Sequence, residues 1–337
     1  MTGPPDRSGP GADLATQPLL VVSTSPAPPE LFGGGLPEGS EVIRATYEEL
    51  LERAPQADII VGDWSHTIHV DAAVAERASR CRLIQQPTAG YENIDLAAAD
   101  QAGIPVANAG PANANAVAEH AVMSIIGCLR HLREAIADAE AGEWEQQRWI
   151  DKDLSDLEGK TVGILGFGAI GQAIAQRLAG FDCTVLYHRR HRLDPDAEQR
   201  LSATHVELDA LASRSEVLVL AIPLTPETRG MLSAERLSEM PSGAVLVNVS
   251  RGGLVDEDAL VAGLEQRRLG GAALDVFATE PLPRGHRFSG LPNVLLTPHI
   301  AGMTVNSKRN ILINSISNIG RVARGEAPFW VVNNPGR

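Results

Sequence analysis

Three ionisable side chains in the second half of the chain have the types needed for acid–base chemistry on a carboxylic acid. Arg251, Glu280 and His299 each follow an apolar run that predicts a strand, and open α/β sheets bind ligands outside the carboxyl ends of their strands. An Arg holds a carboxylate through two parallel hydrogen bonds, and a His transfers protons near neutral pH. A Glu beside the His orients the imidazole and stabilises its charged form. These residue types therefore indicate proton transfer on a substrate that carries a carboxylate.

Each of the three residues also has a structural interpretation. His299 could be a hydrogen-bonded structural histidine, Arg251 could cap a sheet edge, and Glu280 could be a turn residue before a proline. The matching positions after strand ends favour catalysis for His299. The glycines after Arg251 predict open space around its side chain, which favours a function there as well.

A glycine-rich turn predicts a second site, which binds a dinucleotide. The strand expected at 161–166 runs into Gly166-x-Gly168-x-x-Gly171, and a helical pattern follows. Gly166 permits the tight turn, Gly168 lets the backbone approach the pyrophosphate, and Gly171 lets the helix pack against the strand. The start of the helix offers free N–H groups and a partial positive charge to the phosphates.

The residue at the end of the next predicted strand, 183–188, bears on the choice of cofactor. NAD-binding units carry an Asp or Glu there to accept the ribose 2′-hydroxyl, whereas this chain has His188, Arg189 and Arg190. Arg189 stands at the position of the acid and can pair with a 2′-phosphate. We predict NADP(H) in preference to NAD(H), which stays possible; the alternative is a solvated basic strand end without a ligand.

Composition limits the class of protein. The chain has 337 residues, of which 44% are hydrophobic, and a net charge of −13. These values predict one or two globular domains and argue against nucleic acid or an anionic membrane as the main partner. The three cysteines form no disulfide or metal pattern. Residues 1–17 are predicted to be a disordered tail and not a signal peptide, so we expect a cytoplasmic location.

Alternating apolar and helical patterns predict the elements that position these residues. Strands are expected at 19–23, 41–46, 58–62 and 82–85 in the first part of the chain, and at 161–166, 183–188, 216–221, 244–249, 272–276 and 294–296 in the second. Helices are expected at 47–53, from Ala116 to about Ala141, and over 305–323. The second series predicts a Rossmann-type doubly wound sheet. Its glycine turn comes nearly halfway along the chain, so either another domain precedes it or the dinucleotide domain is an insertion.

Several ordered motifs resemble those of the D-isomer-specific 2-hydroxyacid dehydrogenases, a family that includes glyoxylate/hydroxypyruvate reductases and phosphoglycerate dehydrogenases. The resemblance covers about residues 40 to 330. The motifs, besides the glycine turn, are Gly103-Ile-Pro-Val-Ala-Asn108, Ala116-Val-Ala-Glu-His120, Pro223-Leu-Thr-Pro-Glu-Thr228, Asn248-Val-Ser-Arg-Gly252, Leu274-Asp-Val-Phe277 with Glu280-Pro281, and Thr297-Pro-His-Ile-Ala-Gly302.

The resemblance implies a fold and a domain division. The fold is two Rossmann-like or flavodoxin-like α/β domains with parallel sheets, the dinucleotide domain being inserted into the substrate domain. Residues 18–113 with 303–337 would form the substrate domain, and residues 114–302 the dinucleotide domain. It also implies a homodimer built on the dinucleotide domain.

The resemblance also implies roles for individual residues. Arg251 would bind the substrate carboxylate and polarise the keto oxygen, His299 would act as the general acid in reduction, and Glu280 would be its partner. Asp275 would contact the nicotinamide carboxamide. The other expected contacts are Ala169 and Ile170 with the pyrophosphate, Pro223 and Val249 with the nicotinamide end, Gly302 with the cofactor, and Thr88, Ala89 and Gly90 with the substrate carboxylate.

The expected function is an NADPH-preferring 2-keto acid reductase, equivalently a D-2-hydroxyacid dehydrogenase, with domain closure around hinges near 113–115 and 301–304. Two alternatives are a non-catalytic NAD(P)-sensing corepressor or scaffold on the same fold, and an enzyme that oxidises a phosphite- or phosphonate-type acid. The sequence leaves the choice open among glyoxylate, hydroxypyruvate, phenylpyruvate and phosphonate-bearing acids, because the first-domain loops that contact the substrate side chain carry no recognisable motif. Trp64 and His66 either contact the substrate side chain or form a packed loop.

Overall fold

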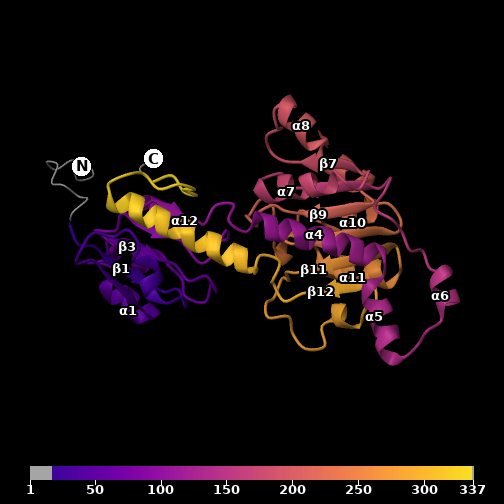
Figure 1. The fold of residues 1–337 in the computed structure, drawn as a ribbon, viewed down its shortest axis with the longest axis horizontal. Coiled ribbons are helices and arrows are strands. Elements are labelled where there is room, and N and C mark those ends of the chain that lie inside the picture. The colour runs from indigo at the N-terminus through magenta and orange to yellow at the C-terminus, as the bar shows by residue number, and fades with distance from the viewer. Residues whose placement is uncertain (1–16, 336–337) are drawn as a thin grey trace. The chain divides into compact units, whose positions relative to one another are not determined.

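The computed structural model describes residues 17–335, so the predicted tail lies outside the described residues except for Gln17. The chain divides into two compact units (Figure 1). Among the described residues, the small unit consists of 17–112 and 305–335, and the large unit of 113–304. Each unit contains one sheet, and all its strands are parallel. The prediction of two α/β domains with parallel sheets is therefore confirmed.

The small unit has a five-stranded sheet in the order β2-β1-β3-β4-β5. Its strands are β1 (Leu20–Ser23), β2 (Glu41–Arg44), β3 (Ile59–Val61), β4 (Leu83–Gln85) and β5 (Val106–Ala107), and its helices are α1 (Tyr47–Arg53), α2 (Ala72–Arg77), α3 (Leu96–Gln101) and α12 (Val305–Ala323). Thr46 and Glu49 begin α1 with a reciprocal capping box. Helix α12 closes one face, where Ile319 packs into a cluster with Val21 and Ile59.

The large unit has a seven-stranded sheet in the order β12-β11-β10-β9-β6-β7-β8. Its strands are β6 (Thr161–Leu165), β7 (Thr184–His188), β8 (Ala203–His205), β9 (Val217–Leu220), β10 (Ala244–Asn248), β11 (Leu269–Leu274) and β12 (Val294–Leu296). Its helices are α4 (Ala114–Leu129), α5 (Leu132–Ala141), α6 (Gln146–Ile150), α7 (Ala169–Leu178), α8 (Pro195–Leu201), α9 (Leu208–Arg214), α10 (Ala234–Glu239) and α11 (Glu257–Glu265). Two hydrophobic clusters, one containing Val162 and the other Leu218, pack around this sheet.

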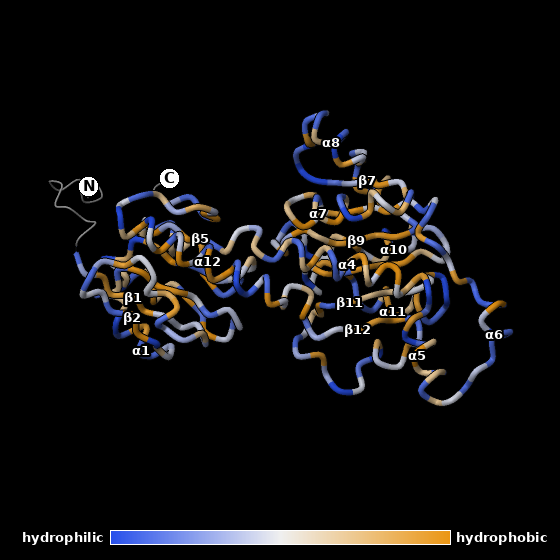
Figure 2. The backbone as a smooth tube through the Cα atoms, in the orientation of Figure 1, coloured by the Kyte–Doolittle hydropathy of each residue, from blue (hydrophilic) through white to orange (hydrophobic). Residues whose placement is uncertain are grey.

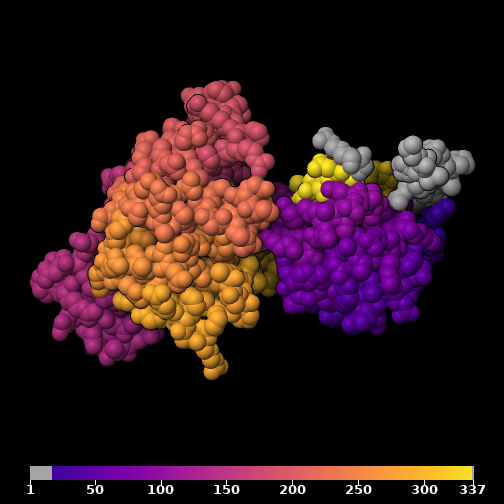
Figure 3. All heavy atoms as spheres, turned by 180° about the vertical axis from the view of Figure 1, so that it is seen from behind, coloured from indigo at the N-terminus to yellow at the C-terminus, as the bar shows by residue number. Residues whose placement is uncertain are grey.

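Hydrophobic residues are concentrated in the strands (Figure 2). This is expected, because both faces of a parallel sheet are buried under other elements. β9, for instance, is buried at all four residues. Figure 3 shows one face of each unit as closely packed atoms. Among the described residues, no helix is both long and apolar enough to cross a membrane.

The predicted long helix from Ala116 to about Ala141 is wrong in one respect, because it is two helices. His131 adopts a left-handed backbone conformation with φ of 48°, which ends the regular hydrogen-bonding pattern between α4 and α5. β5 and β8 were not predicted, because the two residues of β5 and the sequence Ala-Thr-His of β8 form no apolar run like those of the predicted strands. β11 begins at Leu269, whereas the predicted strand began at residue 272. The prediction missed the first residues because glycines such as Gly270 and Gly271 are disfavoured in strands.

Candidate active site

His299 and Glu280 form a hydrogen-bonded pair beyond the carboxyl ends of β12 and β11. His299 Nδ1 lies 2.8 Å from Glu280 Oε2, and the backbone N–H of Phe277 donates to Glu280 Oε1 at 2.9 Å. The glutamate is thus held from both sides. Because Nδ1 faces the carboxylate, Nε2 is the ring nitrogen left to exchange a proton with a ligand. The His299 side chain is 47% exposed, so a ligand can reach it.

Glu280 remains charged over a wide pH range. Partial burial opposes its charge, but hydrogen bonds from His299 and the Phe277 N–H, with the positive charges of His299 and Arg251, hold its pKa below the ordinary value. The pair therefore keeps a negative charge beside the imidazole at neutral pH.

A buried carboxylate, Asp275, holds the loop that carries His299. Its Oδ1 accepts hydrogen bonds from Thr297 Oγ1 at 2.6 Å and from the Ile300 N–H at 2.9 Å, and its Oδ2 accepts from the Ala301 N–H at 2.8 Å. Its backbone carbonyl accepts from the His299 N–H at 2.8 Å. The loop therefore wraps around Asp275, which is 2% exposed.

The backbone at His299 is itself unusual, with φ of 55°. A left-handed conformation at a residue with a Cβ is costly and persists only where its surroundings fix it. The contacts of Asp275 supply that fixation. His120 adds to them from α4, since its Nε2 lies 3.2 Å from Thr297 Oγ1. Neither Thr297 nor His120 is among the predicted site residues. Thr297 begins the loop itself, whereas only the tertiary structure brings His120 to it from α4.

Arg251 follows β10 on a loop that packs against the segment leading to Glu280. A Cβ on Gly252 would lie 1.9 Å from the carbonyl carbon of Phe277, so only a glycine allows this approach. The prediction that the glycines after Arg251 leave open space is therefore wrong for Gly252, which serves close packing. Arg251 Nη1 donates to the Ser250 carbonyl at 2.6 Å, and Asn248 Nδ2 donates to the Arg251 carbonyl at 3.0 Å.

The glycine turn between β6 and α7 has the form that a dinucleotide phosphate requires. Gly166 has φ of 93°, and a Cβ there would lie 2.4 Å from the Ala221 carbonyl oxygen. A Cβ on Gly171 would lie 2.3 Å from the Gly166 oxygen, whereas one on Gly168 would meet nothing within 4 Å. The turn is therefore closely packed at Gly166 and Gly171 and open at Gly168. Helix α7 begins without a side-chain cap, so the first N–H groups, including those of Ala169 and Ile170, suit an anion.

The arginines after β7 differ in whether a carboxylate of the described residues pairs with them. Arg192 makes a two-pronged pair with Glu198, at 2.9 and 2.6 Å, and the hydrogen bonds from Arg192 and Tyr187 lower the Glu198 pKa to about 2. Within residues 17–335, the Arg189 guanidinium makes one long hydrogen bond, 3.3 Å, to the Phe167 carbonyl in the glycine turn, and the Arg189 carbonyl lies 3.4 Å from His205 Nε2. Arg190 is exposed and forms no ion pair within residues 17–335.

The remaining predicted cofactor residues lie in the same unit. His188 Nδ1 contacts the Val206 carbonyl at 2.9 Å, and the Pro223 carbonyl accepts from Thr228 Oγ1 at 2.8 Å. Val249 is buried, and Gly302 packs against the Asn113 side chain.

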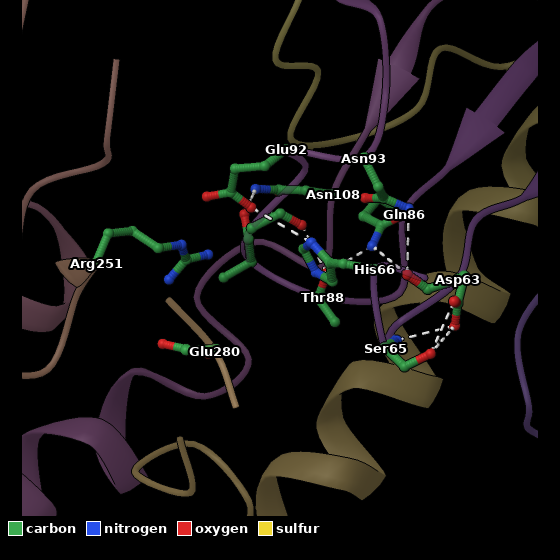
Figure 4. Close-up of polar contacts among 12 residues, drawn as sticks. Asp63, Ser65, His66, Gln86, Thr88, Glu92, Asn93, Asn108, Arg251 and Glu280 are labelled. Atoms are coloured by element: carbon green, nitrogen blue, oxygen red, sulfur yellow. Dashed lines mark hydrogen bonds and ion pairs between the residues drawn. The ribbon is translucent and has the colours of Figure 1, made fainter. Parts of the chain in front are cut away.

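The small unit holds a polar loop after β4, and Figure 4 shows it next to His66 and Glu92, whose side chains lie 3.5 Å apart. Gln86 Nε2 donates to Thr88 Oγ1 at 2.8 Å, and Thr88 Oγ1 donates to the Gly90 carbonyl at 2.6 Å. Asn108 Nδ2 donates to the Ala89 carbonyl at 2.8 Å. The predicted substrate residues Thr88, Ala89 and Gly90 therefore form a loop that side-chain amides fix in place.

A buried aspartate stands behind this loop. Asp63, 1% exposed, accepts hydrogen bonds from the N–H and hydroxyl groups of Ser65 and Thr67 at 2.7 to 2.9 Å (Figure 4). Burial opposes its charge, but these bonds outweigh it and lower the pKa of Asp63. Gln86 Nε2 connects the Asp63 turn to the loop of Thr88, because it also donates to the Asp63 carbonyl at 3.0 Å.

Comparison with known proteins gives a consistent assignment. The NAD-binding domain of the D-isomer specific 2-hydroxyacid dehydrogenases matches residues 122–301. A glyoxylate reductase of Pyrococcus furiosus is 39% identical over 290 residues, which is 85% of each chain. A glyoxylate reductase structure from Paecilomyes thermophila has a TM-score of 0.83 at 30% identity and covers 94% of this chain and 98% of its own. An acyclic imino acid reductase, in a complex with NADPH and D-Arg, has a TM-score of 0.81 at 25% identity, covering 93% of this chain and 100% of its own.

Proposed function

The chain belongs to the D-isomer-specific 2-hydroxyacid dehydrogenase family, and from this premise we propose that it reduces a 2-keto acid with NADPH as the preferred donor. Membership makes the protein an NAD(P)-dependent oxidoreductase acting on a CH–OH group. The observation that carries the proposal is the His299–Glu280 pair at 2.8 Å, on a loop held by Asp275. Residues 113–304 are proposed to bind the cofactor, and the small unit to bind substrate.

The chain's own residues supply the acid–base part of the reaction. Arg251 binds the substrate carboxylate and polarises the keto oxygen, and the loop of Thr88, Ala89 and Gly90 also binds the carboxylate. Nε2 of His299 donates a proton to the oxygen that becomes the hydroxyl, and in the reverse direction it removes that proton. Glu280 stabilises the charged imidazole. The nicotinamide, when bound, supplies the hydride to the keto carbon, so that one hydride and one proton convert the keto acid to the hydroxy acid.

The proposed preference for NADPH rests on Arg189 and Arg190. Arg189 lies against the glycine turn with one long hydrogen bond, so its guanidinium can pair with a 2′-phosphate. Gly166, Gly168 and Gly171 with the start of α7 would hold the pyrophosphate. The cofactor site is proposed to include also His188, Pro223, Val249, Asp275 and Gly302.

The test is the oxidation of NADPH and NADH, side by side, with glyoxylate and a panel of 2-keto acids. We expect turnover with NADPH preferred. Arg189→Ala should lower kcat/KM for NADPH by about 10- to 100-fold, since a charged hydrogen bond contributes about 1.5–3 kcal/mol, and should change the value for NADH little. Arg200→Ala is the matched control, because Arg200 is exposed on α8.

Two other results would count against parts of the proposal. A preference for NADH would remove the role of Arg189 and leave the reductase. Cofactor binding without turnover of any keto acid would favour a cofactor-sensing protein over an enzyme.

We also propose that the large unit forms a homodimer. Three large apolar side chains on α4 and α5 are exposed, namely Met123 at 53%, Leu132 at 44% and Ile136 at 48%. They line a hollow of about 520 Å3, and such patches commonly mark interfaces. Sedimentation equilibrium should give a dimer, and Ile136→Glu should give a monomer, whereas Ile313→Glu on α12 should leave the dimer intact.

A further inference from the structure

An apolar hollow of about 310 Å3 opens at the carboxyl edge of the small unit's sheet. Residues after three strands line it: Ala27, Pro28, Leu31 and Phe32 after β1, Trp64 after β3, and Pro87 after β4. Lys308, Arg309, Ile311 and Leu312 of α12 complete the wall. The hollow therefore belongs to the small unit alone.

The position of the hollow in the sheet is one where ligands bind. β1 lies between β2 and β3. The chain therefore moves from β1 to β2 toward one edge of the sheet, and from β3 to β4 toward the other edge. A crevice outside the carboxyl ends of the strands at such a reversal is the general ligand site of open α/β sheets. The residues on either side of this reversal, Pro28 and Trp64, both line the hollow.

The hollow lies next to the proposed substrate loop. Pro87, in its wall, is followed directly by Thr88. On the β3 side, Trp64 is two residues before His66, whose Nε2 lies 3.3 Å from Thr88 Oγ1. A substrate whose carboxylate contacts the loop at Thr88 can thus extend its other end toward Trp64.

The wall combines apolar surface with available positive charge. Trp64 and Leu31 are 41% and 42% exposed, so neighbouring residues leave much of both side chains uncovered. Lys308 and Arg309 are exposed and form no ion pair within residues 17–335. In a chain with a net charge of −13, two such cations attract an anionic substrate to this place, while their stems add to the apolar wall.

We propose that this hollow receives the side chain of the substrate, so that the enzyme acts on 2-keto acids with a bulky apolar side chain, aromatic ones above all. The inference rests on the proposed reductase function. The hollow is large enough for an aromatic side chain, since an apolar cavity of roughly 150 Å3 binds benzene. Trp64 offers a ring face to an aromatic group. Glyoxylate has no side chain and leaves the hollow empty.

The experiment compares kcat/KM for phenylpyruvate, 4-methyl-2-oxopentanoate, oxaloacetate and glyoxylate in the full chain and in Trp64→Ala. We expect phenylpyruvate to exceed glyoxylate by about tenfold or more, the scale on which an apolar pocket discriminates. Trp64→Ala should lower the phenylpyruvate-to-glyoxylate ratio by about tenfold, and Trp64→Phe should restore most of it. Phe329→Ala, an exposed aromatic outside the hollow in the same unit, should leave the ratio unchanged.

The possible results separate the two proposals. Turnover of glyoxylate in preference to phenylpyruvate, or equal losses for both in Trp64→Ala, would overturn the inference and leave the reductase function standing. A preference for oxaloacetate that Lys308→Ala removes would also overturn it, because the hollow would then bind a charged side chain. Absence of turnover with all four acids would overturn both.

Discussion

Both sheets place a buried aspartate behind a loop at their carboxyl edge, and the two loops differ in what they present. In the large unit, Asp275 fixes the loop of His299, which is ionisable and paired with Glu280. In the small unit, Asp63 stands behind a loop fixed by the amides of Gln86 and Asn108. The imidazole next to that loop, His66, lies 3.3 Å from Thr88 Oγ1 and 3.5 Å from the Glu92 carboxylate. The buried charge is thus a means of shaping a loop, and the chemistry depends on the group that the loop carries.

The difference suggests a division of labour. In the large unit, the imidazole of His299 lies at hydrogen-bond distance from the Glu280 carboxylate, and such a pair can move a proton. In the small unit, residues 88–90 offer hydroxyl and peptide groups, which orient a ligand but do not exchange a proton near neutral pH. We therefore expect substitutions in the His299 loop to act on kcat and those in the loop of residues 88–90 to act on KM and substrate choice.

Replacing His299 should give the largest effect. His299→Asn keeps a polar side chain but removes the proton donor, so kcat for keto acid reduction should fall by about 10²- to 10⁴-fold. Cofactor binding, measured by fluorescence titration with NADPH, should stay within a few-fold of the native value. A loss of less than tenfold in kcat would show that another group supplies the proton.

Paired replacement of the two aspartates tests the comparison directly. Asp275→Ala and Asp63→Ala each leave buried N–H groups without an acceptor, so each should lower the free energy of unfolding by about 2–5 kcal/mol in thermal or urea unfolding. Only Asp275→Ala should also lower kcat strongly, by about 100-fold, because the His299 loop loses its anchor. Asp63→Ala should raise KM more than it lowers kcat. Equal losses of kcat in both variants would break the contrast between the loops.

Glu280→Gln should have a smaller effect on the rate. The amide keeps a hydrogen bond to the imidazole but removes the negative charge, so kcat should fall by roughly tenfold. The pKa of Glu280 is held below its ordinary value of 4.5, so the native rate should fall only when the pH drops through that lower pKa, and this acid limb should be absent from Glu280→Gln. A merely structural role for Glu280 would leave the limb in place, and Glu280→Asp serves as the variant that retains the charge.

The smallest effect concerns pH and stability at Asp63. Its folded-state pKa is lowered from the model-compound value of 3.8, so its charge stabilises the fold above that pH, and this stabilisation is lost as the pH falls through the lower folded-state pKa. The destabilisation caused by Asp63→Asn should therefore be complete at pH 7 and shrink below pH 3.8. Unfolding curves at several pH values would measure it, and a difference that did not change with pH would contradict the assigned cause.

The features that could be predicted from the sequence are those with a local signature. The strand and glycines of 161–171 and the strand-end positions of Arg251, Glu280 and His299 follow from residue type and spacing. The hydrogen bonds of Asp275 could not be predicted in this way, since its partner Thr297 is 22 residues away. His120 is a sharper case, because its contact with Thr297 spans 177 residues. The break at His131 carries no glycine or proline, so the helical pattern ran across it.

The discontinuity of the small unit has a consequence for how the protein is made. Helix α12 and the residues after it are synthesised after the large unit, yet they complete the small unit: Asn318 Nδ2 donates to Gln85 Oε1 at 2.9 Å, and Asn333 holds Ile104 and Val106. The large unit is one continuous segment, 113–304, and can fold while the ribosome is still adding α12. The small unit must wait until α12 has been synthesised, and until then the apolar face under α12 is uncovered. Loss of α12 and the residues after it would therefore harm residues 17–112 more than the large unit.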